Sequence, residues 1–475
     1  MNFIKKYWLL IAASFLVALF LFLRFYNLDK SFFFQNDQGR DMLVLWDWKT
    51  TGKPPLLGPQ TSALPINQSS LYFYFLYPGF LLSQGQPVSA NYTLAFFYVA
   101  SLLLGIWWLK RDRKLLLILL FTFFLISIHP QYIIQNRMVW NPSFVGLFLI
   151  SSLLALVRWL KEEKTMDLGI FALSAALAVS FSYSVAPVLL ACLIYILFAK
   201  KKLFLKSIAA VVTSLILINI TTLIFEMRHG FLITKSLFSR GISPQAAVNI
   251  TIQSRVNNFI NYGVSSPNST LNFLVILAAV LLVIYVLVSR KSHKISKELG
   301  ILWLLSFVFS LLLPVQIHTH YIFGIITLMF LFLASLPIKF SLTISAIFAL
   351  IYLNPATVSK YFSPSVRSVA EMSSCFKKVC SEQTAPIFVT VQANFHPYHN
   401  GPEHRFLMKE AGCNVKYIEE PDQSANLMAV VLDGSNYIQG QTSYNELTMF
   451  GKSKEIKRYN CQPNFGVVIL QKIDN

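Results

Sequence analysis

The sequence predicts a polytopic α-helical membrane protein with about eleven transmembrane helices and a small C-terminal extracytoplasmic α/β domain. Three observations predict this fold class. Of the 475 residues, 55% are hydrophobic and only 13% are charged, the mean hydropathy is +0.56, and the composition changes near residue 355. Soluble domains carry about 25% charged residues. Because this chain lacks the charge to cover a water-facing surface, we expect lipid to surround most of residues 1–354.

The distribution of charge argues against a nucleic-acid partner. The formal net charge is +19, but residues 1–354 hold 28 Lys and Arg against 10 Asp and Glu, whereas residues 355–475 hold 12 against 11. The basic excess therefore belongs to the short loops of the membrane part, where it reports topology. Membrane lipid is the expected surrounding, and no nucleic acid is expected to bind.

The first apolar stretch runs from Tyr7 to Leu23, after the basic start Lys5-Lys6. A cleavable signal peptide is the alternative, but Arg24 to Asn27 continue the chain directly without a small-residue cleavage site, which favours a retained anchor. About 20 apolar residues cross the roughly 30 Å of hydrocarbon. Further spans are expected at 91–109, 115–129, 144–160, 167–184, 186–199, 207–225, 271–289, 299–314, 321–336 and 340–353.

The loops between these spans alternate in charge. Basic connections recur at 110–114, 158–164, 200–206, 290–297 and Lys339. The positive-inside rule places them with the N-terminus in the cytoplasm. The expected location is therefore the plasma (inner) membrane, with the C-terminal domain outside the cytoplasm.

Within the membrane domain, 1–354, two external loops are long, at 24–90 and 225–270. The stretch Leu71–Leu82 is apolar but short, is broken by Pro78-Gly79 and is rich in Tyr. We expect it to form a juxtamembrane or re-entrant element at the outer interface, where Tyr is favoured.

The tail, 355–475, is charged and rich in turns. Strand-like runs occur at 386–391, 427–432 and 466–470, with a helical pattern at 403–411, so a small α/β domain is expected. Four of the five cysteines lie here: Cys375, Cys380, Cys413 and Cys461. They allow three disulfide connectivities, of which Cys375–Cys380 with Cys413–Cys461 is the simplest. A zinc site using His396, His399 or His404 is the less favoured alternative, because the spacing matches no standard motif.

The sharpest chemical signal follows the first span, in Asn36-Asp-Gln-Gly-Arg-Asp41. Asp37 is predicted to cap a helix that ends at Gly52. Asp37 and Asp41 are four residues apart and share one side of this helix, with Arg40 adjacent. A carboxylate near low-dielectric lipid can hold a raised pKa and take a proton from a hydroxyl. The alternative is that Asp37 only caps the helix and Asp41 only pairs with Arg40.

The same helix should be amphipathic. Met42, Leu45, Trp46 and Lys49 share one face, which predicts that the helix lies along the membrane interface.

This acidic motif, placed directly after the first span, resembles the first-loop motif of GT-C glycosyltransferases, most closely the branch of the protein O-mannosyltransferases and lipid A aminoarabinose transferases. The resemblance implies that Asp37 is the catalytic base. Gln38 stands where that family often has Glu, so Asp41 is the candidate for any second acid. The segment 71–77 is similar to the family's aromatic juxtamembrane segment, although the usual His-Pro-Pro is absent before it.

Three further polar clusters are expected on the same outer side. Charged and imidazole groups at membrane depth are costly and mark functional sites, although each could also be an interfacial anchor. Arg137, Arg228 and either His318 or His320 are candidates for the phosphate of a polyprenyl donor, since Arg offers two-pronged geometry. The complete set of candidate substrate-binding residues is Arg40, Arg137, Asn141, Glu226, Arg228, His229, His318, His320 and Tyr321.

Together these features predict an inverting glycosyltransferase that uses a polyprenyl-phosphate sugar donor and an acceptor whose identity the sequence leaves open. No Walker or Rossmann motif is present in the sequence, which fits a lipid-linked donor. No cofactor is required by the sequence, and a divalent metal ion stays open. The rival hypotheses are a transporter or flippase of lipid-linked saccharides, and a receptor or scaffold built around the tail.

Overall fold

The computed structural model describes residues 2–61, 64–240, 251–313, 317–365, 367–393, 400–438 and 445–473. The chain separates into two compact units. The first, here called the helical unit, comprises Met1–Tyr26, Pro55–Leu76 and Asn91–Tyr361. The second, here called the sheet unit, comprises Asn27–Pro54, Tyr77–Ala90 and Phe362–Asn475.

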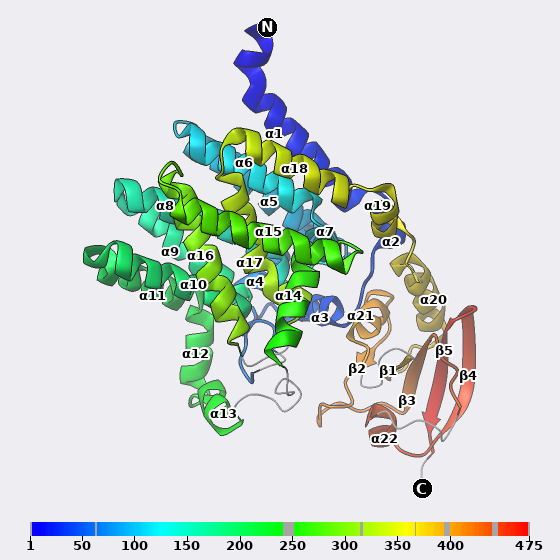
Figure 1. Cartoon of the computed structure of the whole chain (residues 1–475). Coiled ribbons are helices and arrows are strands. Elements are labelled where there is room, and N and C mark those ends of the chain that lie inside the picture. Colours follow the sequence, from blue (N-terminus) through cyan, green and yellow to red (C-terminus); the bar gives the residue numbers. More distant parts are fainter. Residues whose placement is uncertain are drawn as a thin grey trace. The chain divides into compact units, whose positions relative to one another are not determined.

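The helical unit contains a helix at each of the expected spans (Figure 1). Its longer helices are α1 (Asn2–Phe25), α5 (Ser89–Leu109), α6 (Arg113–Ile128), α8 (Val145–Glu162), α9 (Thr165–Phe181), α10 (Ala186–Ala199), α11 (Phe204–Ile218), α15 (Ser269–Val288), α16 (Lys294–Leu311), α17 (Phe323–Ala334) and α18 (Ile338–Tyr352). Among the described residues, four helices are long and apolar enough to cross a membrane, or up to seven if each of three bent helix pairs forms one span. The predicted number of crossings thus stays a prediction.

Shorter elements join these helices. They are α7 (Pro130–Arg137), η1 (Asn141–Phe144), η2 (Tyr183–Val185), η3 (Lys201–Leu203), α12 (Ile220–Arg228), α13 (Leu232–Arg240), α14 (Ile252–Val264) and η4 (Thr319–Ile322). The segment predicted to be juxtamembrane is helical, as α4 (Leu71–Leu82). The chain passes from one unit to the other within α4, α5 and α19 (Pro355–Phe362), and also after Tyr26 and after Pro54.

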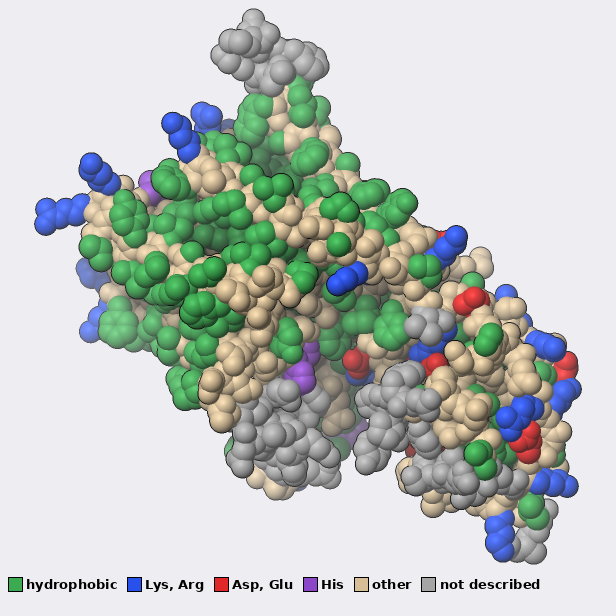
Figure 2. Space-filling model, turned by 45° about the vertical axis from the view of Figure 1, so that its right-hand side comes forward, with side chains coloured by type: hydrophobic (Ala, Val, Ile, Leu, Met, Phe, Trp, Pro, Cys, Tyr) green, Lys and Arg blue, Asp and Glu red, His purple; other side chains and the backbone are tan. Residues whose placement is uncertain are grey.

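The basic loops of the helical unit meet at one end. Lys161 lies 3.5 Å from Asp112, and Lys200 lies 2.7 Å from Glu163. Burial and the nearby Lys114 and Lys161 lower the pKa of His293, which places the loop at 290–297 in the same group. Figure 2 shows several Lys and Arg side chains together at the upper left of this unit, whose visible face is otherwise mostly apolar. This grouping is what the predicted alternation of loops requires.

The sheet unit contains a five-stranded mixed sheet, ordered β2-β1-β3-β5-β4. Its strands are β1 (Ile387–Ala393), β2 (Val415–Lys416), β3 (Leu427–Asp433), β4 (Ser453–Gln462) and β5 (Phe465–Lys472). β1 is parallel to β2 and β3, whereas β5 is antiparallel to β3 and β4. The three strands expected from sequence correspond to β1, β3 and β5. The edge strand β4 was not predicted, because most of its side chains are exposed and four of its ten residues are charged.

Helices complete the sheet unit. They are α2 (Leu28–Ser31), α3 (Asn36–Thr51), α20 (Val369–Glu382), α21 (Pro402–Glu410) and α22 (Asn445–Phe450). α20 packs on β4 and α21 packs on β1 and β2 (Figure 1). The motif helix α3 packs on α21, so part of the segment predicted to be the first external loop belongs to the same unit as the tail.

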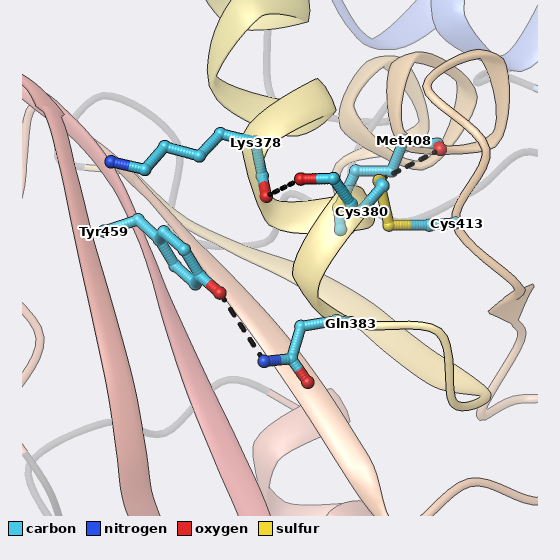
Figure 3. The surroundings of a disulfide bond; sticks show 7 residues. Lys378, Cys380, Gln383, Met408, Cys413 and Tyr459 are labelled. Carbon is cyan, nitrogen blue, oxygen red and sulfur yellow. Dashed lines mark hydrogen bonds between the residues drawn. A yellow bond between two sulfur atoms is a disulfide. The ribbon is translucent and has the colours of Figure 1, made fainter.

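The four tail cysteines form two disulfides, Cys375–Cys461 and Cys380–Cys413. Figure 3 shows the second of them. The simplest pairing expected from sequence, Cys375–Cys380 with Cys413–Cys461, is therefore wrong. Cys375 and Cys380 lie five residues apart on α20. At 3.6 residues per turn, such side chains point in clearly different directions and cannot meet.

Candidate functional site

The acidic motif forms the first turn of α3. The helix begins at Asn36, with Gln35 as its N-cap residue, and the backbone N–H of Gln35 donates to Oε1 of Gln38 at 3.2 Å. The prediction that Asp37 is the N-cap is wrong, because this Gln pair already occupies that place. Asp37 instead lies inside the first turn, where the helix dipole favours negative charge. Gly52 ends the helix in the left-handed region, with φ of 70°, as predicted.

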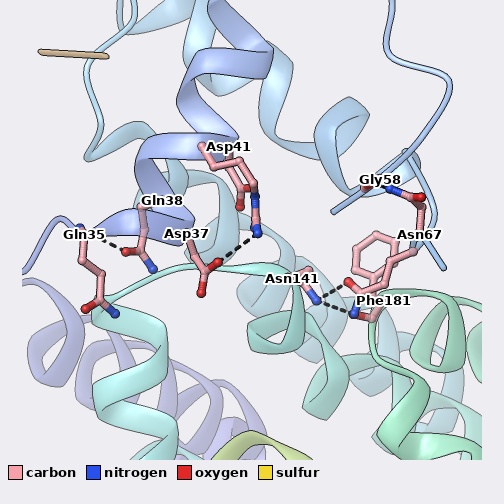
Figure 4. Close-up of polar contacts among 10 residues, drawn as sticks. Gln35, Asp37, Gln38, Asp41, Gly58, Asn67, Asn141 and Phe181 are labelled. Carbon is pink, nitrogen blue, oxygen red and sulfur yellow. Dashed lines mark hydrogen bonds and ion pairs between the residues drawn. The ribbon is translucent and has the colours of Figure 1, made fainter. Parts of the chain in front are cut away.

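Arg40 connects the two carboxylates of the motif. Its Nη1 donates to Asp37 at 2.9 Å, while Nε and Nη2 donate to Asp41 at 3.0 and 2.8 Å. Figure 4 shows Asp37 and Asp41 on one side of the helix, as the spacing predicted. The side chain of Asp41 is 1% exposed and that of Asp37 is 38% exposed. Asp41 is therefore buried, whereas Arg40 and Asp37 are partly exposed, so Asp37 is the more accessible of the two acids.

The predicted interfacial face of α3 is buried within the protein. Met42 is 1% exposed and Leu45 is fully buried. Trp46 contacts the ring of Phe406 edge-on, with centroids 6.0 Å apart. The expectation that this face lies along the lipid is wrong, because α21 of the tail covers the face instead.

In the helical unit, Arg137 is buried at the end of α7. Its Nη1 donates to the carbonyl oxygens of Arg24 at 2.9 Å and of Tyr26 at 3.1 Å. These carbonyls end α1, where a cation complements the helix dipole. Arg137 therefore stabilises the C-terminal end of α1.

Asn141 is also buried and also bonds to the protein. Its Nδ2 donates to Oε1 of Gln68 and, at 2.7 Å, to the carbonyl oxygen of Phe181 (Figure 4). It thereby joins the loop before α4 to the end of α9.

The histidine cluster, His318 and His320, contacts the segment that contains Arg137 and Asn141. The ring of His320 lies 4.6 Å from that of Trp140 and 4.3 Å from that of Tyr321. His318 lies 5.9 Å from His320 and is the more exposed of the two. Burial lowers the pKa of His318 below its ordinary 6.5, so this imidazole is mainly neutral at pH 7.

The cluster around Glu226 makes its contacts locally. Glu226 accepts the backbone N–H groups of Ile233 at 2.8 Å and Thr234 at 2.9 Å, which caps α13. His229 stacks on Phe225, with ring centroids 4.0 Å apart. Of this group, Arg228 is the exposed cation.

Two buried groups in the helical unit were not predicted. Arg24 donates from Nη2 to the carbonyl oxygen of Ile126 at 3.3 Å, and Nε2 of His129 lies 3.2 Å from the carbonyl oxygen of Gly263. Both residues stand at the end of an apolar run, and that placement was the signal available in the sequence. They join the ends of α1, α6 and α14.

Among the described residues, no group of three or more His, Cys, Asp and Glu has the arrangement to hold a metal ion. Two of the three histidines of the zinc alternative, His396 and His399, lie outside the described residues. The third, His404, is fully buried beside Glu403.

No protein-family model matches the chain, and no curated protein matches it in sequence. Its fold is similar to two crystal structures of ArnT from Cupriavidus metallidurans, one bound to undecaprenyl phosphate and one in the apo state. Each has a TM-score of 0.64 and 11% sequence identity; the alignments cover 97% and 99% of this chain and 98% of ArnT. The cryo-EM structure of the arabinofuranosyltransferase AftD from Mycobacteria has a TM-score of 0.50 and 13% identity, over 98% of this chain and 40% of AftD. The chain therefore has the fold seen in ArnT, which is the fold that the resemblance of the first-loop motif predicted.

Proposed function

We propose that this chain is a membrane glycosyltransferase that moves a sugar from a polyprenyl-phosphate-linked donor to an acceptor on the extracytoplasmic face. The observation that carries the proposal is the likeness over almost the whole of both chains to ArnT, a structure that holds undecaprenyl phosphate. The accessible carboxylate at Asp37, directly after the first span, supplies the group that such a transfer needs.

In the proposed mechanism, Asp37 accepts the proton of the acceptor hydroxyl as that oxygen attacks the anomeric carbon. The bond from the anomeric carbon to the phosphate oxygen breaks on the opposite side, so the configuration inverts and polyprenyl phosphate leaves. General-base assistance of this kind contributes about 10²–10⁴-fold. Arg40 holds Asp37 in place through the 2.9 Å ion pair.

A cation near the leaving phosphate would stabilise the charge that develops there. Arg228 is the favoured candidate because its side chain is exposed, whereas Arg137 already donates to carbonyl groups. His318 can contribute a neutral hydrogen-bond donor at pH 7, since its pKa is lowered.

The direct test measures release of undecaprenyl phosphate by purified protein in lipid nanodiscs, with a panel of undecaprenyl-phosphate pentoses and hexoses as donors and a panel of lipids, glycans and peptides with free hydroxyl groups as acceptors. Asp37→Asn should abolish release while the protein still folds and inserts. Asp29→Asn, which removes an exposed carboxylate from the neighbouring α2, is the matched control and should release at the normal rate. Repeating the assay with EDTA tests the need for a divalent ion.

Two outcomes would contradict the proposal. Near-normal release by Asp37→Asn would remove the base. Movement of a lipid-linked saccharide across proteoliposomes without any release of undecaprenyl phosphate would favour the flippase alternative.

A further inference from the structure

We infer that the C-terminal domain positions the proposed base, by holding α3 on a rigid α21, and that Gly39 is the positioning residue at this contact. The inference rests on the proposed function, since it gives the tail a role in the same transfer. It answers a question that the sequence left open, namely what the tail contributes to a membrane transferase.

The contact between α3 and α21 is a close backbone approach. A Cβ atom added at Gly39 would lie 2.6 Å from the carbonyl carbon of Pro402 and closer still to backbone atoms of Glu403. Contacts below 3.0 Å with backbone cannot be relieved by turning a side chain. Position 39 must therefore be Gly if the two helices are to keep this distance.

Gly39 stands midway between the two acids of the motif. Asp37 lies two residues before it and Asp41 two residues after it. The helical backbone joins all three rigidly, so a shift of α3 at Gly39 displaces both carboxylates. Displacements of about 1 Å can cost about 10²-fold in rate when a catalytic group loses its alignment.

Buried charged residues hold the first turn of α21 in place. Glu403 and His404 lie in the first turn of α21, and both are fully buried. Arg367, which precedes α20, lies 3.6 Å from Glu403 and also pairs with Asp433 at the end of β3. One guanidinium thus ties the start of α21 to α20 and to the sheet.

A disulfide bond holds the C-terminal end of α21 in place. Cys413 follows α21 and is bonded to Cys380 on α20 (Figure 3), and its backbone N–H donates to the carbonyl oxygen of Met408 at 3.0 Å. With both ends anchored, α21 cannot yield to a clash at Gly39, so α3 would have to move.

Side chains extend the contact along both helices. The ring of Phe406 lies 5.9 Å from that of Phe34 and 6.0 Å from that of Trp46. Near the other end of α3, Nζ of Lys409 lies 3.3 Å from Asp47. These residues set the direction of α3 as well as its distance from α21.

The experiment combines a docking measurement with kinetics. Asp47→Cys and Lys409→Cys introduce two thiols across the contact, and a short bis-maleimide links them. The native cysteines do not compete, because four are in disulfides and Cys192 is buried. Gly39→Ala in this background should lower the cross-linking yield several-fold.

In the chain without introduced cysteines, Gly39→Ala should lower kcat at least tenfold while KM for the undecaprenyl-phosphate sugar changes less than twofold. A loss of folded protein alone would lower the amount of active enzyme without loosening the cross-link in the folded fraction. Gly169→Ala is the matched control, because a Cβ there meets no atom within 4 Å, and it should change neither measurement.

If Gly39→Ala does not fold, Phe406→Ala provides a milder test in the same direction, since it removes packing against α3 without a clash. Normal cross-linking in Gly39→Ala, or reduced cross-linking with normal kcat, would overturn the inference. If the wild-type chain releases undecaprenyl phosphate from no donor, the proposed function fails and the catalytic role of the contact fails with it. The cross-linking result then still decides whether α21 holds α3.

Discussion

Asp41 is buried on α3 and accepts two hydrogen bonds from Arg40, at 3.0 Å from Nε and at 2.8 Å from Nη2. The same guanidinium donates from Nη1 to Asp37, which is partly exposed. One arginine therefore pairs with two acids that differ in exposure. Because Asp41 is buried and Asp37 is partly exposed, replacing each acid by Asn should have a different effect.

Asp41→Asn should act mainly on stability. The change keeps the shape of the side chain but removes the charge that pairs with Arg40, and loss of a buried hydrogen-bonded partner costs about 1–3 kcal/mol. We expect a lower midpoint of thermal unfolding and a partial loss of transfer, in contrast to the complete loss expected for Asp37→Asn. Unchanged unfolding together with complete loss of transfer would instead make Asp41 a catalytic acid or base.

Arg137→Ala should also destabilise the protein. Its Nη1 donates hydrogen bonds to the carbonyl oxygens of Arg24 and Tyr26. Leaving such buried acceptors without a donor lowers the free energy of unfolding by about 1–3 kcal/mol. Thermal unfolding in detergent measures the effect, with Arg111→Ala, an exposed arginine, as the control. If Arg137→Ala unfolds normally but binds undecaprenyl phosphate more weakly, the phosphate role predicted from sequence is the right one.

The sequence predicted those features that depend on local hydropathy. Every expected span contains a helix, and the short apolar runs in β1, β3 and β5 predicted the strands of the tail correctly. Both patterns are visible because burial in lipid or on both faces of a sheet selects continuous runs of apolar residues, long for a span and short for a strand. β4 lacks such a pattern, since Lys454, Glu455 and Lys457 are exposed at the edge of the sheet.

Features that depend on distant partners were not predictable. The contact of Gly39 with Glu403 joins residues far apart in the chain, and no property of the first loop alone indicates that the tail covers it. The same holds for Arg137, whose acceptors belong to α1. The acids of the motif were found from spacing, but which of them is buried depends on packing that only the fold provides.

The disulfide pattern predicts the result of peptide mapping. Digestion without reduction should yield linked peptides containing Cys375–Cys461 and Cys380–Cys413. The bonds close loops of 86 and 33 residues. In the chain-entropy model, bonds that close such loops stabilise the folded state by about 5 and about 4 kcal/mol, because they restrict the unfolded chain. Reduction should therefore unfold the tail at a lower temperature, while an apolar helical unit without disulfides keeps its helical circular dichroism. Recovery of a Cys375–Cys380 peptide would contradict this structure of α20.

The first turn of α20 should respond to acid. Glu371 accepts the backbone N–H and the hydroxyl of Ser368, both at 2.9 Å, and these hydrogen bonds lower the pKa of Glu371 below its ordinary 4.5. A carboxyl whose pKa is lowered by folding stabilises the folded state above its ordinary pKa, and that contribution is lost as the pH falls through the lowered value.

Hydrogen exchange of the amides at the start of α20 can follow this loss. At pH 7, Ser368→Ala should expose these amides to faster exchange, since N-cap removal costs about 0.5–2 kcal/mol. Glu371→Gln should have a smaller effect in the same direction, and its difference from the wild type should disappear once the pH is below the lowered pKa, because the wild-type carboxyl is then also neutral. If the difference between Glu371→Gln and the wild type persists unchanged in acid, the charge of Glu371 does not hold this turn, and the Ser368 cap and the buried ion pair of Arg367 anchor the start of α20 without it.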